Sequence, residues 1–247
     1  LNPITSAAAH QGSTITSITN PSAGGTISAF TALSSNVTAV TGATRLNAVA
    51  SGSDSSATTT TTSAWTTSAT TSKVITFPSE NQLRYFFNAG GMIRMSWARS
   101  GGTATDQNTS WTNMLSVAGT IVLTGAASSK QIASVAYTGT TKIGGGGTTP
   151  ATLATGTGAD VLGGSTTIFK QLNNSYLYTS NFIQVNASKS SNVITFAVTL
   201  SDNDPTVGTD QINGTLTMTT TIRNPSTSNL TASWGTVTQN AATWSLS

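Results

Sequence analysis

The sequence predicts a mainly β protein: an antiparallel β-sandwich, jelly-roll-like, with two or three short helices and an extended N-terminal arm. Two observations favour this fold class. Thr and Val, which are β-branched and suit strands, fill long runs of the chain. Several segments between turn-rich stretches also alternate apolar with polar residues. This alternation is typical of strands in antiparallel sheets that expose one face to solvent. In residues 192–200 the apolar face consists of Ile194, Phe196, Val198 and Leu200, and residues 214–222 alternate in the same way.

The composition limits the classes of partner. Charged residues make up 7% of the 247 residues, against about 25% in an average soluble domain. The net charge is +3 and no run of like charge follows the chain, so we expect no nucleic-acid partner. No apolar run approaches the roughly 20 residues of a membrane span, so we expect no membrane partner. The absence of cysteine leaves burial and strand pairing to hold the fold.

Residues 1–25 are rich in Ser, Thr, Pro and Gly and lack periodicity, which is typical of an extended arm. We assign residues 26–247 to one β-sandwich domain. A helix is expected near residues 27–41, with Thr26 as its N-cap and Gly42 as its end. Its stripe is formed by Ile27, Phe30, Leu33, Val37 and Val40.

The Thr-rich run 57–77 predicts two strands, at Thr58 to Trp65 and Ser72 to Phe77. Low-complexity coil is the alternative for this run.

Residues 79–97, SENQLRYFFNAGGMIRMSW, hold the clearest local signals. Ser79 followed by Gln82 is a capping-box pattern that opens a helix over residues 80–88. Gly90 and Gly91 supply the left-handed backbone that ends a helix. Residues 92–97 then alternate as a strand whose buried face is Ile93, Met95 and Trp97.

A weaker copy of this helix–glycine–strand unit follows. Ser110 is expected to cap a helix over 111–118, Gly119 to end it, and residues 120–125 to resume as a strand. The two units could pack side by side. Further strands are expected in 134–140, 166–172, 181–188, 192–200, 214–222 and 232–239.

The sequence offers few groups for catalysis, and we assign no catalytic residue, no cofactor and no enzyme activity. His10, the only histidine, falls in the arm and is expected to be solvated. A carboxylate pair for glycoside hydrolysis stays open, because such pairs need not be adjacent in sequence. The negative charge of Glu80 is expected to stabilise the first turn of the helix over 80–88.

Asp202, Asp204 and Asp210 in SDNDPTVGTD are weak candidates for a calcium site. A tight turn between the strands 192–200 and 214–222 is the favoured interpretation, because Asp, Asn and Pro all suit turns. The segment IGGGGTTP at 143–150 lacks the residues of a phosphate-binding loop and is expected to be a mobile loop.

The cluster of aromatics and arginines in residues 84–99 could stack on sugars or single-stranded nucleic acid. The favoured interpretation is structural: Leu83, Phe86 and Phe87 lie under the helix, and the arginines lie at the rim or pair with acids.

Four segments together carry a family resemblance. LRYFFNAGGMIRMSW (83–97), TSWTNMLSVAGTIVLTG (109–125), NFIQVNASKSSNVITFAVTLSDND (181–204) and INGTLTMTTT (212–221) resemble virion structural proteins of tailed bacteriophages, which carry a similar FFN-x-GG segment. The lead-in HQGSTITSI…GGTISAF is similar to that of the same group.

This resemblance implies a noncatalytic virion component, assembled in the host cytoplasm, that self-associates and docks to other virion proteins in the tail, neck or fibre. The homo-oligomer would form by burial of apolar faces and by strand addition from the arm. Capsid decoration is the alternative placement. A carbohydrate-binding adhesin for a host-surface glycan, with sugars on Tyr176, Tyr178 and Trp234, is the rival function, and a polysaccharide depolymerase is the third.

Overall fold

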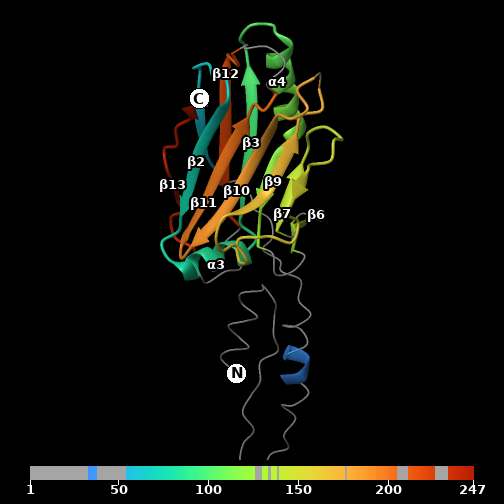
Figure 1. Ribbon diagram of the computed structural model, residues 1–247. Coiled ribbons are helices and arrows are strands. Elements are labelled where there is room, and N and C mark those ends of the chain that lie inside the picture. The colour runs from blue at the N-terminus through green and yellow to red at the C-terminus, as the bar shows by residue number, and fades with distance from the viewer. Residues whose placement is uncertain are drawn as a thin grey trace, which may run out of the picture.

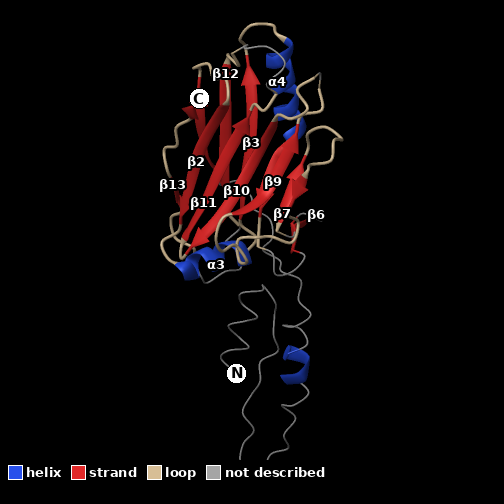
Figure 2. Cartoon of the chain, in the orientation of Figure 1, coloured by secondary structure: helices blue, strands red, loops and turns tan. Residues whose placement is uncertain are grey.

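The computed structural model describes residues 33–37, 54–125, 130–132, 135–137, 139–175, 177–204, 211–225 and 233–247. In these residues the chain is mainly β, with two antiparallel sheets and three helices, and it has the arrangement of a β-sandwich (Figures 1 and 2). Jelly-roll-like connectivity stays a prediction. The arm 1–25 lies outside the described residues, and of the helix expected at 27–41 the structure describes residues 33–37, which are helical.

The first sheet has five strands in the order β1-β12-β3-β4-β7. Their bounds are Asp54–Thr61 (β1), Thr215–Arg223 (β12), Met92–Ser100 (β3), Thr120–Leu123 (β4) and Thr140–Ile143 (β7). β3 and β4 are antiparallel neighbours, so the strands of the two helix–glycine–strand units do lie side by side.

The second sheet has seven strands, in the order β13-β2-β11-β10-β9-β8, with β14 also paired to β2. Their bounds are Thr238–Gln239 (β13), Ser68–Thr76 (β2), Val193–Ser201 (β11), Phe182–Ser190 (β10), Thr166–Leu172 (β9), Thr152–Leu153 (β8) and Ser245–Leu246 (β14). β5 (Lys130–Ile132) and β6 (Val135–Tyr137) form a separate antiparallel pair.

The inward faces of the two sheets share one hydrophobic core. Ile93, Met95 and Trp97 of β3 are buried, as the alternation predicted. The ring of Trp97 stacks on Phe169 of β9, with a centroid distance of 6.3 Å and an interplanar angle of 4°. This contact joins the two sheets directly.

The helix α3 (Glu80–Asn88) confirms the capping signals and closes one end of the sandwich (Figure 1). Ser79 Oγ accepts from Gln82 N at 3.3 Å and donates to Gln82 Oε1 at 3.0 Å. Gly90 has a φ of 102°, which favours glycine. Gly91 is needed for another reason, because a Cβ there would meet the Phe86 ring at 2.5 Å.

The helix α4 (Asp106–Ala118) begins earlier than the sequence predicted and runs beside the other end of the sandwich (Figure 1). Its N-cap is Thr105, whose side chain accepts from Asn108 N, so the assignment of Ser110 as the cap is wrong. Ser110 lies inside the helix, is buried, and donates to Ser175 O. Gly119 ends α4 as expected, with a φ of 65°.

Some strand predictions needed correction. β1 ends at Thr61, and Trp65 makes only an isolated bridge to Ile212. β11 and β12 belong to different sheets and so do not form a hairpin, and residues 205–210 of the expected turn lie outside the described residues. Of the strand expected at 232–239, the described residues hold only the two-residue β13.

Candidate functional site

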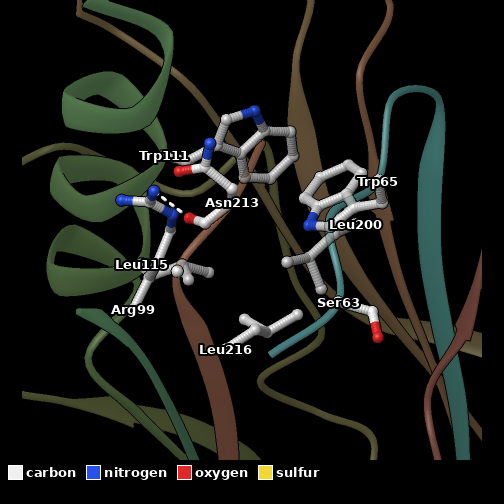
Figure 3. A pocket seen from close by; sticks show the side chains of 9 residues that line it. Ser63, Trp65, Arg99, Trp111, Leu115, Leu200, Asn213 and Leu216 are labelled. Atoms are coloured by element: carbon white, nitrogen blue, oxygen red, sulfur yellow. Dashed lines mark hydrogen bonds between the residues drawn. The ribbon is translucent and has the colours of Figure 1, made fainter. Parts of the chain in front are cut away.

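One arginine of the cluster in residues 84–99, Arg99, lies beneath α4 beside a very small cavity (Figure 3). Trp65 and Trp111 lie on one side of it, and Arg99 and Asn213 lie on another. Its volume is about 10 Å³, which is room for about one water molecule. The cavity is therefore too small for a substrate.

Arg99 is the charged group of this cluster and is only 9% exposed. Its Nη1 donates to Asn108 O and to Thr112 Oγ1, both at 3.0 Å, and its Nη2 donates to Asn213 O. Burial lowers the pKa of Arg99, although an arginine keeps its charge in proteins. Among the described residues no carboxylate pairs with it, so the expectation that Arg99 lies at the rim or pairs with an acid is wrong.

Two asparagines far apart in the sequence complete the cluster. Asn213 N donates to Asn108 Oδ1 at 3.1 Å, and Asn108 Nδ2 donates to Asn213 Oδ1 at 3.2 Å. Thr103 N also donates to Asn213 Oδ1, at 2.8 Å. These bonds fix the loop before β12 to the first turns of α4. These bonds use most of the donors and acceptors of the two amides. Few are therefore left to bind a ligand.

Asp202 and Asp204, two of the weak metal candidates, each accept hydrogen bonds from protein groups. Gln107 Nε2 donates to an oxygen of Asp202, and Ser180 N donates to Asp204 Oδ2 at 3.1 Å. Burial raises the pKa of Asp202, the nearby Asp204 carboxylate adds to this rise, and the hydrogen bond from Gln107 opposes it.

Asp210, the third metal candidate, lies outside the described residues. Within the described part of the chain, no three His, Cys, Asp or Glu side chains come together where they could hold a metal ion.

The aromatics proposed for sugar stacking are differently placed. Tyr178 and Trp234 are buried, and the Trp234 ring lies edge-on to Phe86 at 6.1 Å, so these faces are not offered to a sugar. Tyr176 and His10 lie outside the described residues.

The remaining candidates have structural contacts. Glu80 pairs with Arg84 at 3.0 Å. In the glycine-rich segment, Lys142 Nζ donates to Gly146 O at 3.3 Å, and a Cβ on Gly145 would lie 2.2 Å from Val117 O. The segment expected to be a mobile loop therefore packs against the end of α4.

Sequence analysis missed a second buried cation, Lys73 of β2. It is 1% exposed, its Nζ donates to Asn240 O at 2.6 Å, and burial lowers its pKa. The signal available was its position: Lys73 lies between Thr71 and Ile75 on the inward face of an alternating strand.

No helix among the described residues is long and apolar enough to cross a membrane. Comparisons of the chain with protein-family models, with curated proteins and with solved structures find no match.

Proposed function

We propose that this chain is a noncatalytic structural component of a tailed-phage virion, which self-associates and docks onto neighbouring tail, neck or fibre proteins. The placement in a virion rests on the resemblance of the four segments named above. One of them, LRYFFNAGGMIRMSW, forms most of α3, its glycine end and the first part of β3.

The proposal that the chain is noncatalytic is supported by the contacts of its few charged, amide and indole side chains. The guanidinium of Arg99 binds backbone carbonyls and a threonine hydroxyl, and the amide of Gln107 binds Asp202. Trp234 packs against Phe86. General acid–base or nucleophilic catalysis needs such groups to converge on an open pocket. Here they connect elements of the fold.

The outer face of the five-stranded sheet supports a role in packing against other proteins. Ser56 and Thr60 of β1 form cross-strand contacts with Thr221 and Thr217 of β12, at 2.8 and 3.5 Å between hydroxyl oxygens. Because hydroxyls lose less on desolvation than ions do, a face of this kind can be covered by a neighbour at low cost.

Antibody-gold labelling of purified particles, with antibodies raised against this chain, tests the proposal. We expect gold at the tail, neck or fibres. Gold spread over the head would move the chain to capsid decoration. Unlabelled particles, with the antigen free or on cells, would contradict the virion role and favour the adhesin.

A truncation tests how the chain docks. We expect a chain without residues 1–25 to remain folded and soluble but to fail to enter particles, because the arm is proposed to add a strand to a neighbour. Normal incorporation of the truncated chain would show that docking does not need the arm.

A further inference from the structure

The C-terminal segment, residues 233–247, closes one side of the sandwich through two short stretches of strand pairing with β2 and through backbone bonds of its last residue, Ser247. β13 and β14 each pair only two residues with β2, whereas β11 pairs nine residues with the other edge of the same strand. In Figure 1 this segment runs beside β2 at the margin of the molecule. A strand held by so short a ladder opens at lower free energy than the central strands do.

The backbone of Ser247 exchanges hydrogen bonds with Ser68 and accepts from Thr66 N and Thr67 N, and the residues before it add bonds of their own to β2. Asn240 N donates to Val74 O at 3.1 Å, Asn240 Oδ1 accepts from Val74 N at 2.8 Å, and Asn240 Nδ2 donates to Ser72 O at 3.1 Å. Lys73 Nζ donates to Asn240 O, and Thr71 Oγ1 donates to Thr243 O at 2.8 Å. Asn240 thus makes hydrogen bonds to the edge of β2 that resemble those of a paired strand.

The same segment also reaches the edge strand of the other sheet. Gln239 Nε2 donates to Ser55 O at 3.2 Å, and Trp244 Nε1 donates to Thr59 O at 3.0 Å. Val237, Trp244 and Leu246 are partly buried against the shared core. When the segment leaves, two strand edges and part of the core are uncovered together, and a free edge is a template for another strand.

We propose that the C-terminal segment is exchanged between two copies of this chain, so that each copy completes the β1 and β2 edges of the other. The acceptor site is specific: it takes an asparagine opposite Val74, a tryptophan opposite Thr59, and apolar side chains between the sheets. A second copy presents this same set of groups. Exchange therefore re-forms every contact of the segment, which makes swapping a low-cost route to oligomers.

This inference identifies the surface through which the chain would self-associate and does not depend on the particle in which it acts. Gold labelling of particles and the test below can therefore fail separately.

The absence of cysteine in the chain gives a clean test by disulfide trapping. Ser245 of β14 lies opposite Thr70 of β2. The Cα atoms of facing residues in antiparallel strands lie about 4.5–5.5 Å apart, within the range that a disulfide spans. Two full-length chains with different tags, one carrying Thr70→Cys and the other Ser245→Cys, are mixed at high concentration, incubated and oxidised. A disulfide between the two tags can form only between chains.

The matched control uses Ser188→Cys and Thr195→Cys, which lie opposite each other in the β10–β11 hairpin. We expect the Thr70/Ser245 mixture to give a mixed-tag dimer on non-reducing gels at several-fold the level of the control mixture. A mixed product no greater than the control would overturn the proposal.

A single chain carrying both Thr70→Cys and Ser245→Cys checks the site itself. Efficient linkage within that chain shows that the two positions meet as the register requires. Failure of this chain to link in any form would remove the contact on which the proposal stands and would also overturn it.

Discussion

At one end of the sandwich α3 packs aromatic rings, whereas α4, towards the other end, covers a buried guanidinium and amides beside a single aromatic pair, Trp65 and Trp111. The Phe86 ring lies 5.2 Å from Phe77, 5.0 Å from Phe87 and 6.1 Å from Trp234. Beneath α4, Arg99 instead binds the carbonyls of Asn108 and Asn213. The same local pattern of helix, glycine and strand therefore serves two kinds of packing.

The difference has consequences for stability. Burial of apolar rings does not depend on pH, and its loss scales with the area and cavity left behind. A buried polar cluster contributes through satisfied hydrogen bonds, and it is costly when one partner is removed. The α3 end should thus respond to side-chain volume, and the α4 end to hydrogen bonding and protonation in addition to volume.

The largest effect is expected from Phe86→Ala. Phe86 is fully buried and contacts three other rings, so we expect the free energy of unfolding to fall by about 3–5 kcal/mol in urea titrations. Tyr85→Ala, at a neighbouring residue that is 46% exposed, is the control and should cost much less. Equal losses for the two variants would show that the aromatic cluster is not what holds this end.

Arg99→Met should have the next largest effect. It keeps the apolar stem but removes the donor to Asn213 O and one of the donors to Asn108 O, which also accepts from Thr112 Oγ1, so a loss of about 2–3 kcal/mol is expected in the same assay. Arg84→Met removes an exposed arginine that pairs with Glu80, and it should cost no more than about 0.5 kcal/mol. If Arg99→Met were as mild as Arg84→Met, the cluster under α4 would not be a structural anchor.

A smaller effect is expected at the end of α4. Gly119→Ala places a side chain at a φ of 65° and brings its Cβ to 2.8 Å from Gly144 O, so we expect a loss of about 1–3 kcal/mol. Gly144→Ala has a similar φ of 67° but open space around the Cβ, which makes it the matched control. Thermal unfolding should rank Gly119→Ala as the more damaging, and the reverse order would argue against close packing of the glycine-rich segment on α4.

The smallest effect is a change in pH dependence at Asp202. Because burial raises its pKa in the folded state, the folded chain binds more protons than the unfolded chain between the two pKa values. This residue's contribution to the free energy of unfolding therefore grows as pH falls through the raised pKa, and Asp202→Asn should remove it. Urea titrations across acidic pH check this, with Phe86→Ala as a variant whose slope with pH should match the unmodified chain.

Sequence signals were sufficient where the structure depends on neighbours in the chain. Ser79, Gln82 and Gly90 fix α3 by local hydrogen bonds and backbone conformation, and the alternation in β3 identified its buried face. The fold class followed from the same kind of pattern.

The α4 end could not be predicted in this way. The first turn of α4 is polar, so its start resembles a loop, and its amides are buried by a partner more than a hundred residues away, Asn213. The C-terminal segment was expected as a strand over 232–239, but the described part is attached to β2 by two short strand pairings, by the backbone of Ser247 and by the side chain of Asn240, whose contacts alternation does not reveal. Contacts of this kind depend on the tertiary arrangement.

The most direct test of the virion role is co-purification of the chain with infectious particles through a density gradient, followed by mass spectrometry of the fractions. The account predicts that peptides of this chain follow the particle peak at a constant ratio to the other virion proteins. Peptides that stay at the top of the gradient while the particles sediment without them would contradict it.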